Sequence, residues 1–418
     1  PWSEPYYLED AAGIDPSLFF DEDGVCYYIG THPNPKGCRY DGDCFIWIQE
    51  LDLEAMKLTG EPRDVWNGAM RRVIWPEGPH LYKKDGWYYI LHAEGGTGFH
   101  HAVTVCRSRS IWGPYENNPC NPILTHRHLG KDCKVQCVGH GDLVETAEGE
   151  WYMAHLAVRP TDGYTTLGRE TFLTRVVWEN GWPVVNPGMG RVTDQVEVGL
   201  EPWEPVHTVQ EADRIYDFGR MSRLGDEFLF LRNPVPEKYS LCAGEGLTLA
   251  GGGCGLTQKL SPVYVGVRQR HHHFRADALI SLPEAVQPGQ EAGIALLQSN
   301  EYYLRVAFAR ENVGETAVRV YLCEKCEERL LDDRTVPVIG DGKTELGLGL
   351  EVRGLSAAVI LAYGGQETEL VRDVDIRSLS TETAGGFVGC TVGIYVTGDS
   401  DSSQGITFRT FSYQKLEL

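Results

Sequence analysis

The chain has 418 residues, of which 42 % are hydrophobic and 23 % are charged, and it contains 48 glycines. Its formal net charge of -21 would repel nucleic acid and anionic membrane surfaces, and the densest basic stretch, MRRVIW at 70–75, holds only two arginines. No run of 18 apolar residues occurs, so we expect a soluble, turn-rich globular protein with no nucleic-acid partner and no membrane span.

The first half of the chain repeats one pattern three times: a short apolar run, a turn ending in Gly, and an aromatic run. The copies are IDPSLFFDEDGVCYYIG, EGPHLYKKDGWYYILHA and HGDLVETAEGEWYMAHLA, and each is followed by another strand-like run (CFIWIQEL, HAVTVCRS and ETFLTRVVW). Glycine supplies the positive φ of a tight turn, so each copy predicts a hairpin. Repeats of four-strand size predict the blades of a β-propeller.

Each copy places one polar residue just before or at the start of its first strand: Asp15, Glu77 and His140. Blades put equivalent residues at equivalent points around a central axis. We therefore expect these three side chains to converge on one axial pocket. The alternative is that they only cap turns, as acids and histidines often do.

A connector rich in proline and glutamate ends the repeats, and the chain then changes character. Alternating strands separated by turns follow it, among them HHHFRADALISL, TAVRVYLCEK and CTVGIYVTGD. This pattern predicts an antiparallel β-sandwich. The expected fold is all-β, with a propeller domain at 1–203, a linker at 204–216 and a sandwich at 217–418.

The twelve cysteines are scattered, and several lie within strand-like runs. This distribution favours buried, reduced thiols and a cytoplasmic location, although export cannot be judged from a chain that begins at Pro1 in a loop-like stretch. The Cys323-x-x-Cys326 pair has no second pair at zinc spacing, and the contiguous histidines 271–273 would alternate between faces of a strand. Neither predicts a metal site.

Four motifs in order, AGIDPSLFFDEDG, EGPHLYKKDGWYYILHAEGGTG, GHGDLV and LGRETF, resemble glycoside hydrolase family 43, in its β-xylosidase and α-L-arabinofuranosidase branch. FLRNP, LSPVYVGVRQRHHHF and LSTETAGGFVGC are similar to the concanavalin-like sandwich domain of that branch. The resemblance implies a five-bladed propeller that removes terminal xylose or arabinose from xylo-oligosaccharides or arabinoxylan fragments. It also implies inverting hydrolysis with three carboxyl groups.

The resemblance assigns roles to single residues. Glu77 matches the general acid, Asp15 the carboxylate that orients the acid and tunes its pKa, and Arg169 a sugar-binding arginine. His140 matches an axial histidine that binds calcium in some members, and no other cofactor is implied. This pairing is chemically coherent, because a neighbouring carboxylate raises the pKa of an acid and keeps it protonated near neutral pH.

Trp75, Thr97, Phe99 and His101 flank the second copy. We expect them to line the sugar pocket, with strand packing as the alternative for Trp75.

The general base of the family, an aspartate in a motif resembling Asn-Pro-Asp-Pro, has no match upstream of Asp15. With three copies where a propeller usually needs at least four blades, we expect the first blades and the base to be missing from this chain. Such an open ring should be poorly soluble and show no xylosidase turnover. The alternative function is a non-catalytic carbohydrate-binding or structural remnant. The oligomeric state stays open, with a homo-oligomer among the alternatives.

Overall fold

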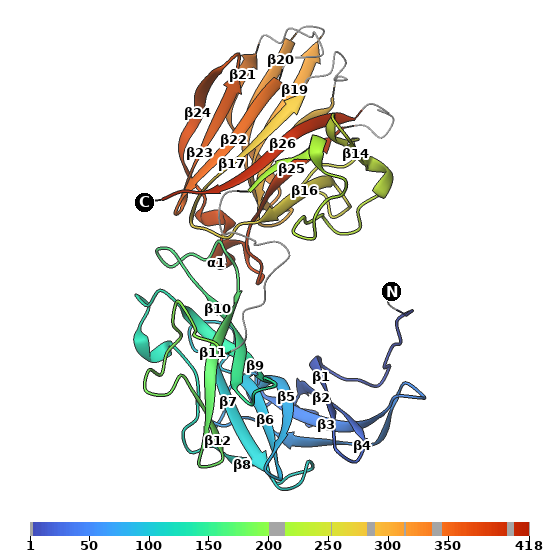
Figure 1. Cartoon of the computed structure of the whole chain (residues 1–418), viewed down its shortest axis with the longest axis vertical. Helices are drawn as coiled ribbons and strands as arrows, with labels where there is room; N and C mark the ends of the chain where they lie inside the picture. The colour runs from blue at the N-terminus through green and yellow to red at the C-terminus, as the bar shows by residue number, and fades with distance from the viewer. Residues whose placement is uncertain are drawn as a thin grey trace. The chain divides into compact units, whose positions relative to one another are not determined.

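The computed structural model describes residues 3–199, 214–251, 253–281, 289–312, 315–336, 345–398 and 405–417. The chain forms two compact units: Pro1–Arg159 with Arg169–Pro202, and Pro160–Gly168 with Trp203–Leu418. Strands form nearly all of the regular structure in both (Figure 1). Among the described residues, no helix has the length and apolar character that a membrane crossing would need.

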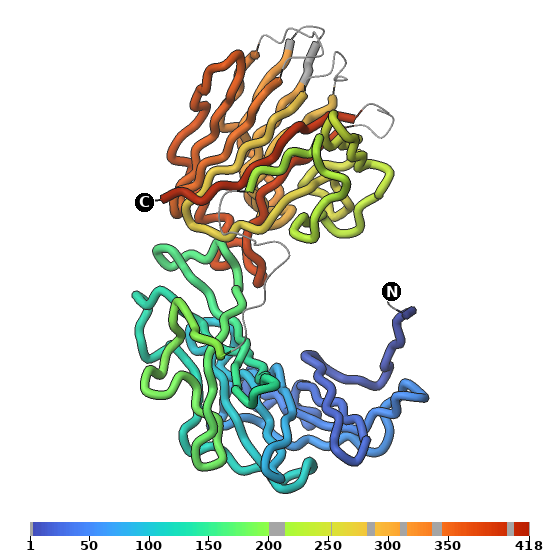
Figure 2. Tube along the Cα trace, viewed as in Figure 1, coloured from blue at the N-terminus to red at the C-terminus, as the bar shows by residue number. Residues whose placement is uncertain are grey.

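The first unit contains three separate sheets, each of four antiparallel strands in sequence order. Figure 2 follows the chain through them from blue to green. The strands are β1 Ile14–Phe20, β2 Cys26–Pro33, β3 Cys44–Asp52 and β4 Lys57–Trp66; β5 Glu77–Lys84, β6 Trp87–Glu94, β7 Ala102–Ser108 and β8 Glu116–Asn117; β9 Gln136–Glu145, β10 Trp151–Val158, β11 Glu170–Glu179 and β12 Trp182–Val185. Each predicted repeat is one sheet, which confirms the propeller-type architecture.

The turn residues explain why the repeats fold as hairpins. Lys84 pairs with Trp87, which leaves a two-residue loop of Asp85 and Gly86. Both loop residues have positive φ, 52° and 72°. These are the angles that a type I′ turn requires, and its twist matches that of the flanking strands.

Neighbouring sheets meet at their first strands. Ser17 Oγ of β1 lies 3.0 Å from His80 Nδ1 of β5. The hydroxyl of Tyr82 in β5 donates to Asp142 of β9 and accepts from the Leu143 N–H at 2.8 Å. These contacts hold β5 between β1 and β9.

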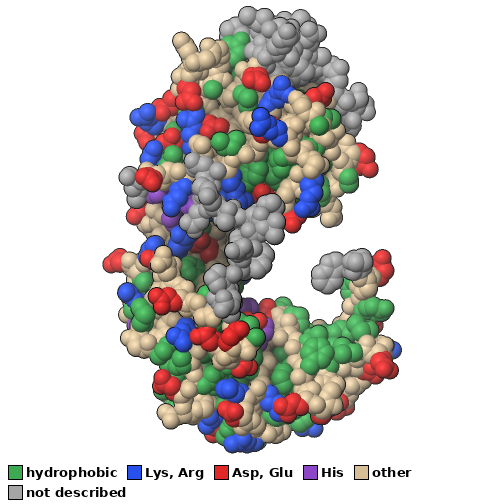
Figure 3. All heavy atoms as spheres, in the orientation of Figure 1, with side chains coloured by type: hydrophobic (Ala, Val, Ile, Leu, Met, Phe, Trp, Pro, Cys, Tyr) green, Lys and Arg blue, Asp and Glu red, His purple; other side chains and the backbone are tan. Residues whose placement is uncertain are grey.

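Strand β1 presents different chemistry on its two faces. Ser17 and Phe19 face the second sheet, where the Phe19 ring lies 6.2 Å from that of Tyr88. The residues of the other face, Ile14, Leu18 and Phe20, are 57, 47 and 62 % exposed. Figure 3 shows hydrophobic side chains gathered on the surface over this part of the first unit.

The second unit consists of two antiparallel sheets that enclose a large apolar core, and a smaller buried cluster that includes Tyr264, Tyr303 and Tyr395 lies apart from it. Strand β17 shows the sandwich pattern plainly, because its buried residues Phe274, Ala276, Ala278 and Ile280 alternate with partly exposed ones. The predicted sandwich is confirmed.

One sheet has the order β14-β15-β26-β17-β22-β23-β24 with β13 paired to β26, and the other has the order β16-β25-β18-β19-β20-β21. The elements are β13 Arg214–Asp217, β14 Tyr239–Cys242, β15 Gly246–Leu249, β16 Val263–Arg268, β17 His273–Ser281, β18 Glu291–Leu297, β19 Tyr302–Asn312, β20 Glu315–Glu324, β21 Glu327–Val336, β22 Glu345–Arg353, β23 Ser356–Tyr363, β24 Gln366–Asp375, α1 Thr381–Ala384, β25 Thr391–Thr397 and β26 Ile406–Lys415.

Two boundaries differ from the sequence-based expectation. Residues 204–213 of the expected linker at 204–216 lie outside the described residues. Its last three residues belong to β13, which pairs with β26. Residues 160–168, expected in the first domain, group with the second unit. Their hydrogen bonds explain why: Thr165 donates its N–H and hydroxyl to Glu382, and Thr166 O accepts from the Cys390 N–H at 2.9 Å.

An ionic network around the buried Arg305 crosses the sheet of β18, β19, β20, β21 and β25, and its two acids are partly exposed. Arg305, 8 % exposed, donates to both carboxylate oxygens of Glu328 at 2.6 and 2.8 Å, and to Glu291 at 2.7 Å. Tyr303 donates its hydroxyl to Glu328 at 2.6 Å, and Arg305 also donates to the Tyr395 hydroxyl at 3.1 Å. All donor groups therefore have partners, as a buried charge requires.

Candidate active site

A β-bulge interrupts the first strand of each sheet at the same place. The register shifts between Ile14 and Ser17 in β1, between Glu77 and His80 in β5, and beside His140 in β9, where Gly139 and Gly141 pair with consecutive residues of β10. A bulge bends the strand and re-aims a side chain. This explains how three ordinary strands each direct one functional residue away from the sheet.

Backbone conformation supports the same interpretation. Asp15 and His140 both have a φ of 53°, and Gly78 has a φ of 57°. Residues other than glycine seldom adopt this left-handed region, and they cluster at functional sites when they do.

The three predicted residues lie close together. The Gly78 N–H, adjacent to Glu77, donates to Asp15 Oδ2 at 3.0 Å. The His140 ring packs on Gly78 so closely that a Cβ there would lie 2.7 Å from two ring atoms. The missing side chain of Gly78 is thus the reason that β9 can approach β5 at this point.

Glu77 has the electrostatic environment of an acid that is protonated at neutral pH. Its burial and the negative charge of Asp15 raise its pKa to about 7, while the positive charge of Arg169 opposes the rise. Burial and a like charge both disfavour the carboxylate form. Glu77 can therefore hold a proton under conditions in which an exposed glutamate has lost it.

The positive charge of the site comes from Arg169, and His140 beside it is neutral. Burial lowers the pKa of His140, and the opposing effect of the charge on Asp15 does not outweigh it. Arg169 directly precedes β11, and its charge acts on both Glu77 and His140. Its neighbour Glu170 is bound by Arg159 through two hydrogen bonds of 2.9 and 2.6 Å, which hold the start of that strand.

His101, expected to line the pocket, is fully buried. Its Nδ1 lies 2.9 Å from the Cys137 carbonyl oxygen, and its ring fills the space in front of Gly139. Burial lowers its pKa to about 4, so the imidazole is neutral. This placement supports β9 beneath His140.

The other expected lining residues occupy two loops. Trp75 is 39 % exposed, and its ring covers Gly96. The backbone N–H of Trp75 donates to the Gly42 carbonyl oxygen at 2.8 Å. Thr97 and Phe99 are half-buried in the loop after β6, and Lys131 lies 5.8 Å over the Phe99 ring. Of these three residues, Trp75 is nearest to Glu77 in the sequence.

The sequence interpretation missed Cys44, a neighbour of the acid. Burial raises the pKa of its thiol to about 11, and nearby charges including that of Glu77 act in the same direction. It also missed the bulges, although the Gly and Pro residues around Asp15, Glu77 and His140 were a usable signal.

A metal site at His140 fits poorly with the residues around it. The described residues contain no group of three or more His, Cys, Asp or Glu side chains that could hold a metal ion. Calcium takes six to eight oxygen ligands, whereas His140 offers a nitrogen. We derive no step through a metal.

Two family descriptions match the chain: "Glycosyl hydrolases family 43" over residues 1–183 and "Beta xylosidase C-terminal Concanavalin A-like domain" over residues 216–414. The chain is 42 % identical to a "Xylosidase/arabinosidase" of Butyrivibrio fibrisolvens over 430 residues, covering 100 % of this chain and 79 % of the relative. It is 31 % identical to a "Non-reducing end alpha-L-arabinofuranosidase" of Bacteroides ovatus, covering 96 and 72 %.

Among solved structures, xylan beta-1,4-xylosidase from Bacillus halodurans C-125 superposes with a TM-score of 0.88 at 30 % identity. The similarity covers 99 % of this chain and 78 % of that one. Both halves of the chain, and the order in which they occur, are thus shared with these proteins.

Proposed function

The chain belongs to glycosyl hydrolases family 43 and is a glycosidase, and from this premise we propose that it removes terminal xylose or arabinose from short xylan-derived oligosaccharides with inversion. The observation that carries the proposal is the half-buried Glu77 beside Asp15, where partial burial and the charge of Asp15 raise the pKa of Glu77 to about 7. The names of the relatives, a xylosidase/arabinosidase and an arabinofuranosidase, support the substrate class.

In the proposed reaction, Glu77 donates its proton to the glycosidic oxygen as the bond to the leaving group breaks. The positive charge that develops on the sugar ring is of the oxocarbenium type, and water attacks the opposite face while its proton passes to a general base. Asp15 keeps Glu77 protonated before the step, and Arg169 binds the sugar. We assign the general base to none of the described residues.

The direct test assays the protein with an aryl β-D-xyloside and an aryl α-L-arabinofuranoside, following the anomeric configuration of the released sugar by NMR. Turnover by residues 1–418 would also contradict the expectation that the general base is missing from this chain. Hydrolysis of either substrate with inversion supports the proposal, and the ratio of the two rates assigns the specificity. Retention of configuration, or binding of xylo-oligosaccharides with no hydrolysis of either substrate, contradicts it. The second outcome would favour the non-catalytic alternative.

Asp15→Asn should move the pH dependence of the reaction. Without the negative charge, the pKa of Glu77 falls, and the acid loses its proton at lower pH. The alkaline limb of the kcat/KM profile should therefore shift toward acid by roughly one pH unit. The measurement is a pH–rate profile of the variant and of the parent protein.

Asp23→Asn provides the matched control, because Asp23 is exposed in the turn after β1 and, among the described residues, accepts a hydrogen bond from the Val25 N–H alone. Asp23→Asn should leave the alkaline limb of the kcat/KM profile at the same pH as in the parent protein. An unshifted limb in Asp15→Asn would mean that Asp15 does not tune the acid.

A further inference from the structure

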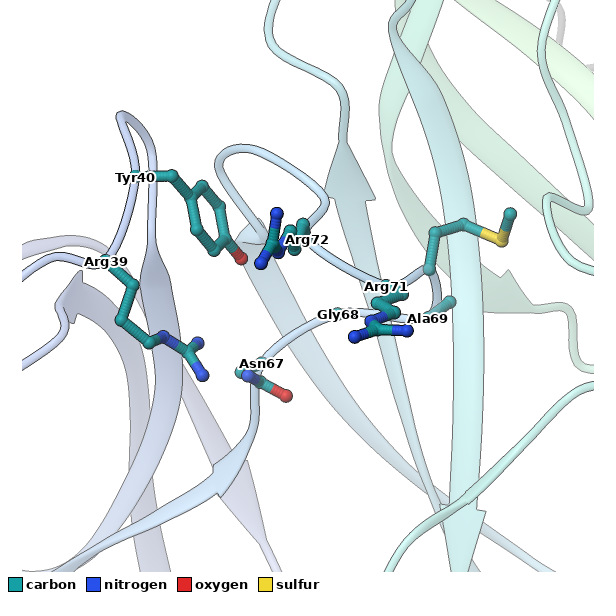
Figure 4. Close-up of a pocket in the computed structure, with 8 residues that line it drawn as sticks. Arg39, Tyr40, Asn67, Gly68, Ala69, Arg71 and Arg72 are labelled. Carbon is teal, nitrogen blue, oxygen red and sulfur yellow. The ribbon is translucent and has the colours of Figure 1, made fainter.

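A second polar cavity lies in the first unit, outside the group of Asp15, Glu77 and His140. Two loops, at 34–43 between β2 and β3 and at 67–76 between β4 and β5, enclose about 580 Å³. We call it the arginine pocket and define it by Arg39, Tyr40, Asn67, Arg71 and Arg72. In Figure 4 the side chains of the two loops extend into the space between them.

Arg39 is held in position by a buried carboxylate. Its Nε and Nη2 donate to the two oxygens of Asp43 at 2.8 and 2.6 Å. Asp43 is fully buried and also accepts from Asn34 at 2.9 Å. A bidentate pair of this kind fixes the orientation of the guanidinium plane.

Arg71 and Arg72 lie on an anchored loop but remain exposed. The Ala69 N–H donates to the buried carboxylate of Glu94, and the Tyr40 hydroxyl donates to the Val73 carbonyl at 3.1 Å. Among the described residues, neither arginine has an ion-pair or hydrogen-bond partner. Two guanidinium groups are thus presented by a fixed backbone without an internal acid to neutralise them.

The charge of the pocket is opposite to that of the molecule. Three arginines line the pocket, where Asp43 pairs with Arg39 and Glu94 binds the Ala69 N–H, in a chain with a net charge of -21. Arginine forks match the planar geometry of a carboxylate, and Asn67 and Tyr40 add groups that hydrogen-bond to hydroxyls. Such a lining suits a sugar acid better than a neutral sugar.

The same loop leads directly to the catalytic acid. Glu77 follows Arg72 by five residues, which span at most about 17 Å even in an extended chain. Trp75, which is partly exposed, lies between Arg72 and Glu77 in the sequence. The hydrogen bond from its backbone N–H to the Gly42 carbonyl joins the two loops. The backbones of Arg72 and Glu77 are therefore at most about 17 Å apart, a span within the length of a short oligosaccharide.

We propose that the arginine pocket binds the carboxylate of a uronic acid carried by the oligosaccharide substrate. The inference deepens the proposed function and rests on it, since it makes the preferred substrate an acidic rather than a neutral xylan fragment. The same chemistry would also accept a free small anion, so the test must separate the two sources.

Calorimetry at low salt on protein carrying Glu77→Gln, which stops hydrolysis, compares a neutral xylo-oligosaccharide with the same oligosaccharide bearing one glucuronic acid. We expect the acidic one to bind roughly tenfold more tightly, or about 1.4 kcal/mol. In Arg71→Ser/Arg72→Ser the ratio of the two affinities should fall to about one. The affinity for the neutral sugar in the same variant is the internal reference for correct folding.

Arg220→Ser/Arg223→Ser is the charge-matched control, because both side chains are at least 80 % exposed in the second unit. It should keep the tenfold ratio. A ratio near one in the parent protein, or a ratio that survives Arg71→Ser/Arg72→Ser, overturns the proposal. Arginine-dependent binding of inorganic phosphate without preference for the acidic sugar also overturns it, since the pocket would then serve a free anion.

Hydrolysis of the two aryl pentosides by the parent protein is measured separately. Hydrolysis with no acidic preference removes only the inference about the pocket. An arginine-dependent preference without hydrolysis supports the pocket and removes the proposed catalytic function.

Discussion

Glu77→Gln should reduce hydrolysis of substrates with poor leaving groups by roughly 10²- to 10⁴-fold, the usual contribution of general acid catalysis. An alkyl xyloside or xylobiose needs a proton on its leaving oxygen, and glutamine has none to give. An activated phenol can leave an aryl substrate as its anion without being protonated. The rate of hydrolysis of such a substrate should therefore fall much less, by about tenfold or under. Steady-state kcat/KM for the two substrate types is the measurement.

The pH profile provides a second readout for the same residue. Because the pKa of Glu77 is about 7 and the protonated form is the active one, kcat/KM of the parent protein should decline as the pH rises through 7. The variant should lack this alkaline limb. Glu54→Gln, at an exposed turn after β3, is the control and should leave rate and profile unchanged. Equal losses on both substrate types would exclude an acid role for Glu77.

Arg305→Leu should destabilise the second unit by about 1–3 kcal/mol, because it removes the hydrogen bonds of a buried guanidinium to carboxylates that are themselves partly exposed and can be hydrated. The substitution leaves Glu328 and Glu291 without the guanidinium that binds them at 2.6–2.8 Å. Hydrogen exchange of the amides in β19 and β20 measures the free energy of opening. Arg353→Leu removes the exposed Arg353–Glu351 pair and should have little effect.

The loss of stability caused by Arg305→Leu should also depend on pH. Burial of Glu328 acts to raise its pKa, but the hydrogen bonds and charge of Arg305 outweigh it and hold the pKa below its ordinary value. A lowered carboxyl pKa stabilises the folded protein above the unfolded pKa of about 4.3, and the effect disappears as the pH falls below it. The difference between parent and variant should therefore shrink at acid pH. A constant difference would place the stabilisation elsewhere.

The sequence predicted those features that follow from periodicity and turn chemistry. The repeat distance predicted that Asp15 and Glu77 occupy equivalent positions, whereas the bulges align Asp15 with Gly78, one residue further along, and the Gly78 nitrogen lies 3.0 Å from Asp15 Oδ2. Asp-Gly turns predicted the hairpins, and the alternation of apolar and polar residues predicted strands such as β17. These signals are local, so they survive without any knowledge of how the elements pack.

Features that depend on packing between distant segments were not predictable. His101 flanks the second repeat in sequence, yet it is buried against Gly139 of the third sheet. The arginines at 71 and 72 were visible as a weak basic stretch, but only folding brings Arg39 from another loop to the same cavity. Residues 160–168 have the composition of an ordinary loop, and only their hydrogen bonds to Glu382 and Cys390 assign them to the second unit.

The left-handed backbone at Asp15 and His140 has a consequence for laboratory evolution. A side chain held at a φ of 53° costs about 1–2 kcal/mol relative to glycine, which adopts that region freely. A library selected for heat resistance alone would therefore be drawn toward glycine at both positions and would lose the groups that surround Glu77. Selection for heat resistance and selection for turnover should thus diverge at the same two codons, and a thermostable catalyst would have to be sought among substitutions elsewhere.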